Sequence, residues 1–96
     1  MKRIEIVANR SVQEELFDLL ARSSVGLRYT LVPQVHGAGN SEPKQGDSTW
    51  PEYNFLLIVY CEDDEARQIA EATRELKRIF PDEGIKLFET DARVVV

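Results

Sequence analysis

Hydrophobic and polar positions along the chain follow periods that predict four strands and two helices. Residues 2–8 alternate, so that Ile4, Ile6 and Ala8 share one side of an extended segment. A period of two is typical of a strand with one buried face. We therefore expect the first strand at residues 2–8.

The next apolar residues recur at helical spacing and indicate an amphipathic helix. They are Val12, Leu16, Leu19 and Leu20, with Phe17 beside them. Ser11 followed by Glu14 has the pattern of a capping box, in which two side chains satisfy free backbone N–H groups at a helix start. We expect the helix to end near Ser23 or Ser24, with Gly26 closing it.

Two segments rich in β-branched, aromatic and other apolar residues predict the second and third strands, at 27–36 and 53–61. Pro33 donates no backbone hydrogen bond, so we expect a sheet edge or a bulge at that position. From Phe55 onward the third strand is apolar on both faces. That pattern is typical of a strand that is buried on both sides.

A second helix is predicted after the acidic run 62–65, because acidic side chains at a helix start accept hydrogen bonds from free N–H groups and interact favourably with the helix dipole. Its apolar face consists of Ala66, Ile69, Ala70, Thr73, Leu76 and Phe80. Pro81 ends this helix, and residues 85–89 predict the fourth strand. Residues 92–96 form either a short fifth strand or a segment that packs on a neighbouring subunit.

The order β-α-β-β-α-β predicts an α+β fold, the ferredoxin-like βαββαβ sandwich, with an antiparallel sheet and two helices on one of its faces. Its 96 residues make one domain, 1–96. The other sheet face would be bare in a monomer, and exposing a large apolar face is unfavourable. We therefore expect a homo-oligomer that covers the open face.

Composition and charge narrow the class of partner. The chain is 43% hydrophobic and 30% charged, and its net charge of −5 argues against nucleic acid as a partner. Cys61 is the single cysteine, so no internal disulfide can form, which fits a reducing compartment. There is no secretory segment at the N-terminus and no apolar run near the roughly 20 residues that cross a bilayer. We expect a cytoplasmic protein without membrane insertion.

The segment between the second and third strands, at about 37–52, is dominated by glycine, proline, serine, asparagine and aspartate. Loops longer than about 12–15 residues are uncommon in compact domains and are usually functional or disordered. We interpret this segment as a flexible loop that contacts another protein. Trp50 is either an anchor for that partner or folds back onto the scaffold. Lys44 and Asp47 are further candidate partner contacts.

Three short motifs accompany this order of elements. Residues 35–39, Val-His-Gly-Ala-Gly, are similar to the Val-Lys-Gly-Phe-Gly of the PII signal-transduction (nitrogen regulatory) proteins at the base of their long loop. Residues 84–88 are similar to that family's Gly-Lys-Ile-Phe-Val, and 89–96 to its acidic, then basic, C-terminal segment. The chain thus resembles a divergent PII-like protein over nearly its whole length. The resemblance implies homotrimers, ATP or ADP in clefts between subunits, and a loop that binds a protein such as a transporter or an enzyme.

The same resemblance points to ligand-binding residues. Gly37 and Gly39 would let backbone N–H groups approach a phosphate or another anion, although a glycine pair also suits a flexible exit from a strand. Lys86 and Arg93 would supply positive charge to a nucleotide phosphate, or are simply solvated. Ser41 stands where the family has a glutamine that helps to place ligand and metal, so we expect weak or metal-independent binding of ATP, ADP or AMP.

An alternative is a metal-binding or metal-responsive trimer, similar in architecture to the CutA family, with His36 and either Glu42 or Asp47 as ligands. Cys61 is too distant to join them within a subunit. In an antiparallel hairpin His36 lies beside Tyr53, roughly 26 Å from Cys61 at about 3.3 Å per residue. The sequence shows no nucleophile with a base at predictable distance, so we do not expect an enzyme.

Overall fold

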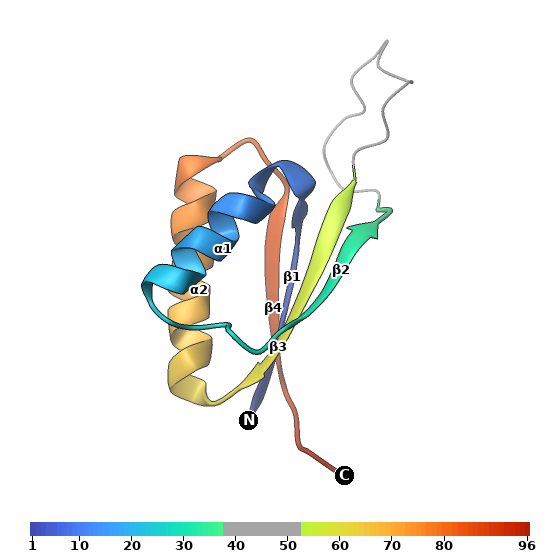
Figure 1. The fold of residues 1–96 in the computed structure, drawn as a ribbon, viewed down its shortest axis with the longest axis vertical. Coiled ribbons are helices and arrows are strands. Elements are labelled where there is room, and N and C mark those ends of the chain that lie inside the picture. The colour runs from blue at the N-terminus through green and yellow to red at the C-terminus, as the bar shows by residue number, and fades with distance from the viewer. Residues whose placement is uncertain (38–52) are drawn as a thin grey trace.

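The computed structural model describes residues 1–37 and 53–96 of the chain (Figure 1). Its strands are β1 (Lys2–Asn9), β2 (Thr30–Val35), β3 (Asn54–Cys61) and β4 (Ile85–Asp91). Its helices are the short 3-10 helix η1 (Arg10–Val12), α1 (Gln13–Arg22) and α2 (Asp63–Ile79). The predicted order β-α-β-β-α-β is confirmed.

The strands form one sheet in the order β2-β3-β1-β4, and every neighbouring pair is antiparallel. Both helices lie on the same face of this sheet (Figure 1). In the register, Val7 of β1 lies opposite Leu56 of β3 and Lys86 of β4. The arrangement is the ferredoxin-like α+β sandwich that the sequence predicts, and it leaves one sheet face without helices.

The core lies between the sheet and the two helices. Alternate residues of β1 and β3 point into it, and the largest of them, Ile4, Ile6, Phe55 and Leu57, are fully buried. The helical side of the core consists of Val12, Leu16, Leu19, Leu20, Ala66, Ile69, Ala72, Thr73 and Leu76. The alternation of the first strand and the apolar face of the first helix therefore correspond to real burial. In the second helix Ala72 is buried, and Ala70, which was predicted for the buried face, is only half-buried.

The capping box predicted at Ser11 does not form. The side chain of Asn9 accepts a hydrogen bond from the Ser11 N–H at 2.9 Å, so Asn9 caps the turn two residues earlier. The chain then makes the 3-10 turn η1 before α1 begins at Gln13. A competing side-chain acceptor directly upstream explains the difference, because asparagine is as good a cap as serine.

The end of α1 is a Schellman motif in which Ser24, and not Gly26, takes the first left-handed position. The N–H of Val25 donates to the Leu20 carbonyl, and the N–H of Ser24 donates to the Ala21 carbonyl, both at 3.1 Å. Ser24 has φ of 52°, a conformation that glycine adopts with less strain. Gly26 has φ of 65° and follows the motif. The helix end near Ser23 is confirmed, but its closing residue was wrongly assigned.

Replacing Ser24 with glycine is expected to stabilise the protein by about 0.5–1 kcal/mol, because it relieves the left-handed strain of a residue with a Cβ. The melting temperature should rise by roughly 2–8 °C for a domain of this size. Ser23→Gly is the matched control, since Ser23 has φ of −97° and gains no relief. Calorimetric melting would contradict the assignment if Ser24→Gly melted at or below the temperature of the parent protein.

The acidic start of α2 is confirmed, but not its predicted capping bonds. Glu62 is the N-cap residue and its side chain makes no capping hydrogen bond. Asp64 pairs with Arg67, and Glu65 accepts a hydrogen bond from the Gly26 N–H at 2.9 Å. These carboxylates therefore interact with the positive end of the helix dipole, while Glu65 ties the connection after α1 to the start of α2.

The strand β2 is an edge strand with an irregularity at Pro33, as expected. Its register with β3 shifts between Val32 and Val35, the interval that contains the proline. The strand begins at Thr30, three residues later than predicted. Tyr29 lies outside the ladder, and its ring packs on Phe17 with ring centroids 5.1 Å apart.

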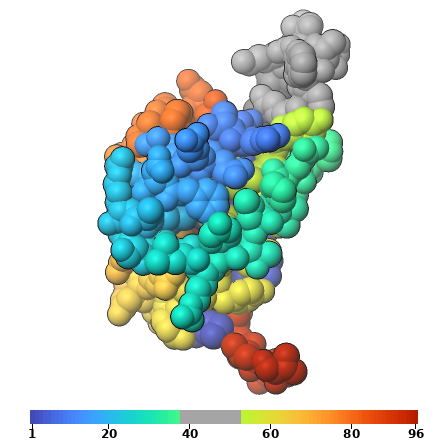
Figure 2. All heavy atoms as spheres, viewed as in Figure 1, coloured from blue at the N-terminus to red at the C-terminus, as the bar shows by residue number. Residues whose placement is uncertain are grey.

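The strand β4 is two residues longer than predicted and is followed by an extended tail. The Ala92 N–H donates to the Met1 carbonyl at 3.0 Å, which is the last backbone bond between the tail and the sheet. Residues 92–96 form no strand in the described part of the chain, and the side chains of 94–96 are exposed. The tail projects from the body of the molecule (Figure 2). Across 1–37 and 53–96, no helix is long and apolar enough to span a membrane.

Candidate functional site

One end of the sheet carries Gly37, the first of the two predicted ligand-binding glycines. Val35 lies opposite Asn54 in the β2–β3 ladder, and a Cβ at Gly37 would lie 3.5 Å from the Asn54 side-chain nitrogen. Asn54 in turn lies opposite Asn9, whose N–H donates to the Gly84 carbonyl at 3.0 Å. We call this row of Gly37, Asn54, Asn9 and Gly84 the loop end of the sheet.

Lys86 lies close to the loop end, as the second residue of β4. It is exposed, and it is opposite Val7 in the β1–β4 ladder. Three strand spacings separate β4 from β2, which amounts to roughly 14 Å at about 4.8 Å per spacing. The fold therefore brings Gly37 and Lys86 to the same end of one sheet without placing them in contact.

Arg93 lies at the opposite end of the sheet. It follows the last residue of β4, Asp91, which is opposite Lys2 at the beginning of β1. Seven residues of extended chain separate Arg93 from Lys86, or roughly 23 Å at about 3.3 Å per residue. Within one subunit, Arg93 is thus not brought together with Gly37.

The neighbours of Arg93 are already paired. The Lys2 ammonium binds the Asp91 carboxylate, and this hydrogen bond raises the pKa of Lys2 and lowers the pKa of Asp91. The N-terminal amine lies 3.9 Å from the Glu62 carboxylate at the same end. This end of the sheet therefore holds paired charges of both signs.

The residues considered for a metal site are also separated. His36 lies against Tyr53 as the hairpin predicts, with an edge-on ring contact and centroids 5.4 Å apart. Cys61 is buried at the other end of β3, and burial, reinforced by Glu65, raises the pKa of its thiol. Within residues 1–37 and 53–96, no three histidine, cysteine, aspartate or glutamate side chains gather as metal ligands do.

The remaining predicted residues of the loop lie outside the described residues. They are Gly39, Ser41, Glu42, Lys44, Asp47 and Trp50. The ligand and partner roles predicted for them stay predictions.

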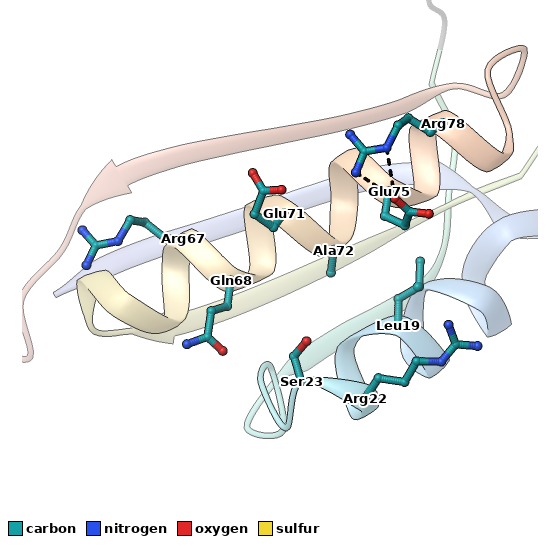
Figure 3. A pocket seen from close by; sticks show the side chains of 9 residues that line it. All are labelled: Leu19, Arg22, Ser23, Arg67, Gln68, Glu71, Ala72, Glu75 and Arg78. Atoms are coloured by element: carbon teal, nitrogen blue, oxygen red, sulfur yellow. Dashed lines mark hydrogen bonds and ion pairs between the residues drawn. The ribbon is translucent and has the colours of Figure 1, made fainter.

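A shallow groove of about 420 Å³ runs between the two helices, on the side away from the sheet (Figure 3). Leu19 and Ala72 are its apolar residues, and charged side chains surround them. Arg78 binds Glu75 through two nitrogens at 3.0 and 2.7 Å, and Glu71 binds Arg74 at 2.6 Å. Because these charges are paired along α2 itself, the groove lacks the convergent polar groups that mark a ligand site.

The sheet face without helices carries both apolar and polar side chains. It is defined by the register of the ladders, and we call it the open face. Its members are Arg3, Glu5, Val7, Asn9, Thr30, Val32, Val35, Asn54, Leu56, Ile58, Tyr60, Lys86, Phe88 and Thr90. Val32, Tyr60 and Phe88 are among the exposed large hydrophobic side chains of the protein. The sequence predicted apolar side chains on this face, because the third strand is apolar on both of its sides.

One polar cluster interrupts the open face at the end away from the loop. The Arg3 guanidinium donates to the Tyr60 hydroxyl at 2.8 Å and to the Glu5 carboxylate at 3.1 Å, and it lies 5.7 Å from the centre of the Tyr60 ring. Bonds to Glu5 and Tyr60 raise the pKa of Arg3. We call these residues the Arg3 network. Sequence patterns did not single it out, although Arg3 and Glu5 alternate on the face opposite the buried isoleucines.

Comparisons with known proteins bear on the fold. No family model matches the sequence, and no curated protein matches it. Among solved structures, CPII, a nitrogen regulatory PII-like protein from Thiomonas intermedia K12 bound to ADP, AMP and bicarbonate, is 22% identical, with a TM-score of 0.71. The match covers 99% of this chain and 92% of that chain. A second CPII structure, bound to ADP and bicarbonate, has a TM-score of 0.72 and 22% identity, covering 97% of this chain and 86% of that chain.

A structure from Thermus thermophilus, described as a PII-like signalling protein, is also 22% identical, with a TM-score of 0.69. The match covers 98% of this chain and 88% of that chain. This chain therefore has the fold of the PII-like signalling proteins, and the divergent PII-like resemblance of the sequence is confirmed at the level of the fold. The neighbours are described as regulatory or signalling proteins, and the ligands named are those of CPII.

Proposed function

We propose that this chain is a PII-like regulatory protein that acts as a cytoplasmic homotrimer. It binds a small anionic ligand, a nucleotide such as ATP, ADP or AMP, between subunits, and contacts a partner protein through residues 37–52. The observation that carries the proposal is the position of Gly37 and Lys86 at the same end of a PII-like sheet. The neighbours solved with ADP support a nucleotide as the ligand.

The chemistry of the loop end suits an anion. Gly37 is exposed and has no side chain, so a phosphate can approach its backbone closely. Gly39, two residues further along the chain, would add a second such position. The exposed Lys86 ammonium makes a charge-assisted hydrogen bond with phosphate, which is stronger than a neutral one.

A second copy of the chain would complete this site. Arg93 lies at the opposite end of its own sheet, so it reaches a loop end only when that end belongs to a neighbouring subunit. The open face supplies a reason for assembly, since covering Val7, Leu56, Ile58 and Phe88 removes apolar surface from water. We therefore place the ligand between subunits and not within one.

The partner-binding role is assigned to residues 37–52. Trp50 would anchor the partner, with Lys44 and Asp47 as charged contacts, because tryptophan is enriched where binding energy concentrates. Ligand binding at Gly37 and Gly39 would change the order of this segment, and the segment would then bind or release the partner. This coupling gives the protein a regulatory rather than a catalytic role.

Isothermal titration calorimetry of the unmodified protein tests the proposal. ATP, ADP, AMP and bicarbonate are titrated separately up to millimolar concentration, with bicarbonate included because both CPII structures contain it. We expect heat with at least one adenine nucleotide, and the same heat when magnesium is chelated, since Ser41 replaces the glutamine of the family motif.

An absence of heat with every nucleotide would overturn the nucleotide proposal. Zinc and copper are titrated in parallel by thermal shift. A shift that His36→Ala removes would favour the metal-binding alternative, in which histidine is the ligand. The two sets of titrations therefore separate the two classes of function.

A further inference from the structure

The Arg3 network is a cluster of hydrogen-bonded polar side chains on the open face. Arg3 and Tyr60 are direct neighbours across the β1–β3 ladder, and Glu5 follows two residues later on the same side of β1. The side chains of Arg3 and Glu5 are only 33% and 35% exposed in the single chain. They are therefore already partly removed from water before anything covers the face.

The network removes net charge from this part of the face. The positive charge of Arg3 is matched by Glu5 at 3.1 Å, so two copies of the face can approach each other without an unmatched charge between them. Lys86, the other cation of the face, lies at the loop end and is exposed. This charge balance suits a second copy of the same chain as the partner.

The network also retains bonding capacity for a neighbour. A guanidinium carries five N–H donors, and the bonds to Tyr60 and Glu5 use one donor on each of the two terminal nitrogens of Arg3. The Glu5 carboxylate and the Tyr60 hydroxyl have further acceptor sites. In a cyclic trimer the same residues of the three copies meet only around the threefold axis, so the network pairs with its copies when it lies at that axis, where the donors of one copy meet the acceptors of the next.

We propose that the Arg3 network determines the arrangement of the homo-oligomer, by pairing with the same network in neighbouring copies of this chain. The inference rests on the proposed function, which includes a homotrimer formed by the open face. The apolar residues of that face favour association in many orientations, because the hydrophobic effect is not directional. Buried polar groups that must find partners restrict the number of acceptable arrangements, as a single polar residue does in coiled coils.

Native mass spectrometry and sedimentation velocity of matched variants test the proposal. In Arg3→Met the Glu5 charge is covered without its partner, so we expect the dissociation concentration to rise by about tenfold or more. In Arg3→Met/Glu5→Met both charges are absent, so association recovers, but other oligomers appear beside the trimer. Arg74→Met is the control, since it breaks an arginine–glutamate pair on the outer side of α2, and its trimer should be unchanged.

Tyr60→Phe provides a milder variant that removes one hydroxyl and keeps the ring. We expect it to fold as the parent protein does, by far-UV circular dichroism, and to form more than one oligomer. The proposal would be overturned if Tyr60→Phe and the double variant both formed trimers and no other oligomer. It would also be overturned if Arg3→Met dissociated at the same concentration as the parent protein. A monomeric parent protein at micromolar concentration would instead refute the homotrimer of the proposed function, and with it this inference.

Discussion

Aspartate at Leu57 unfolds the subunit, whereas aspartate at Leu56 separates folded subunits: this is the expected result of two identical substitutions at adjacent positions of β3. Leu57 is fully buried between the sheet and the helices, opposite Ile6 and Leu31. Leu56 is half-buried and lies on the open face. The opposite outcomes follow from the alternation of side chains along a strand.

The size of the effect follows from the two environments. An unpaired carboxylate in the core at Leu57 loses its hydration and finds no compensating partner, so we expect a loss of at least about 4 kcal/mol in the free energy of unfolding. That loss is comparable to the whole stability of a small domain, which is about 5–15 kcal/mol. At Leu56 the carboxylate stays in water in the monomer, so the cost appears only when another subunit covers the face.

Far-UV circular dichroism and sedimentation velocity distinguish the two results. Leu57→Asp should lack a cooperative melting transition, and Leu56→Asp should melt cooperatively as a monomer. A cooperative transition of Leu57→Asp near that of the parent protein would contradict the assignment of the core. A Leu56→Asp protein that sediments as the parent oligomer would contradict the open face as the interface.

Valine at Gly39 is expected to abolish nucleotide binding and to leave the trimer intact. A branched side chain at this position blocks the close approach of a phosphate to backbone N–H groups. Gly37→Ala tests the same idea at a described position, where a Cβ meets, among residues 1–37 and 53–96, only the side chain of Asn54 at 3.5 Å, an ordinary van der Waals contact. Gly84→Ala is the matched control at the loop end, because no atom of the described residues lies within 4 Å of a Cβ there.

Alanine at Lys86 should weaken nucleotide binding by about 1.5–3 kcal/mol, the range for a hydrogen bond to a charged group. Arg74→Ala serves as a control because it removes a cation from the outer side of α2. Calorimetry measures all of these variants against the same nucleotide, and sedimentation velocity checks that each remains assembled. If Lys86→Ala binds the nucleotide with the affinity of the parent protein, Lys86 is not part of the ligand site. If Gly39→Val binds the nucleotide fully, Gly39 is not part of it either.

Sequence patterns were sufficient for the elements whose signal is repeated over many residues. The alternation at Ile4, Ile6 and Ala8 and the helical spacing from Val12 to Leu20 each report one buried face, and both faces are buried as predicted. The irregularity at Pro33 was also predictable, because a missing N–H acts locally. Hydrophobic period and proline chemistry are properties of the chain itself.

Sequence patterns were insufficient where neighbouring groups compete for the same bond. Asn9 and Ser11 are both good helix caps, and only the path of the chain after β1 decides that Asn9 acts. Ser24 takes the left-handed position although Gly26 is the residue better suited to it. Glu65 bonds to Gly26, 39 positions away in the sequence, and not to its own helix.

The order of strands and helices, the buried side of the first strand and of the first helix, and the resemblance to PII-like proteins were readable from the sequence, because period and local motifs are encoded residue by residue. Which of the predicted site residues share one end of the sheet follows from the pairing of the strands. Antiparallel pairing places Gly37 and Lys86 at the loop end and sends Arg93 to the other end, since strand direction, and not sequence distance, sets these positions. The same pairing brings Tyr60 next to Arg3, which lies 57 positions earlier in the sequence, and Arg3 also binds Glu5 of its own strand.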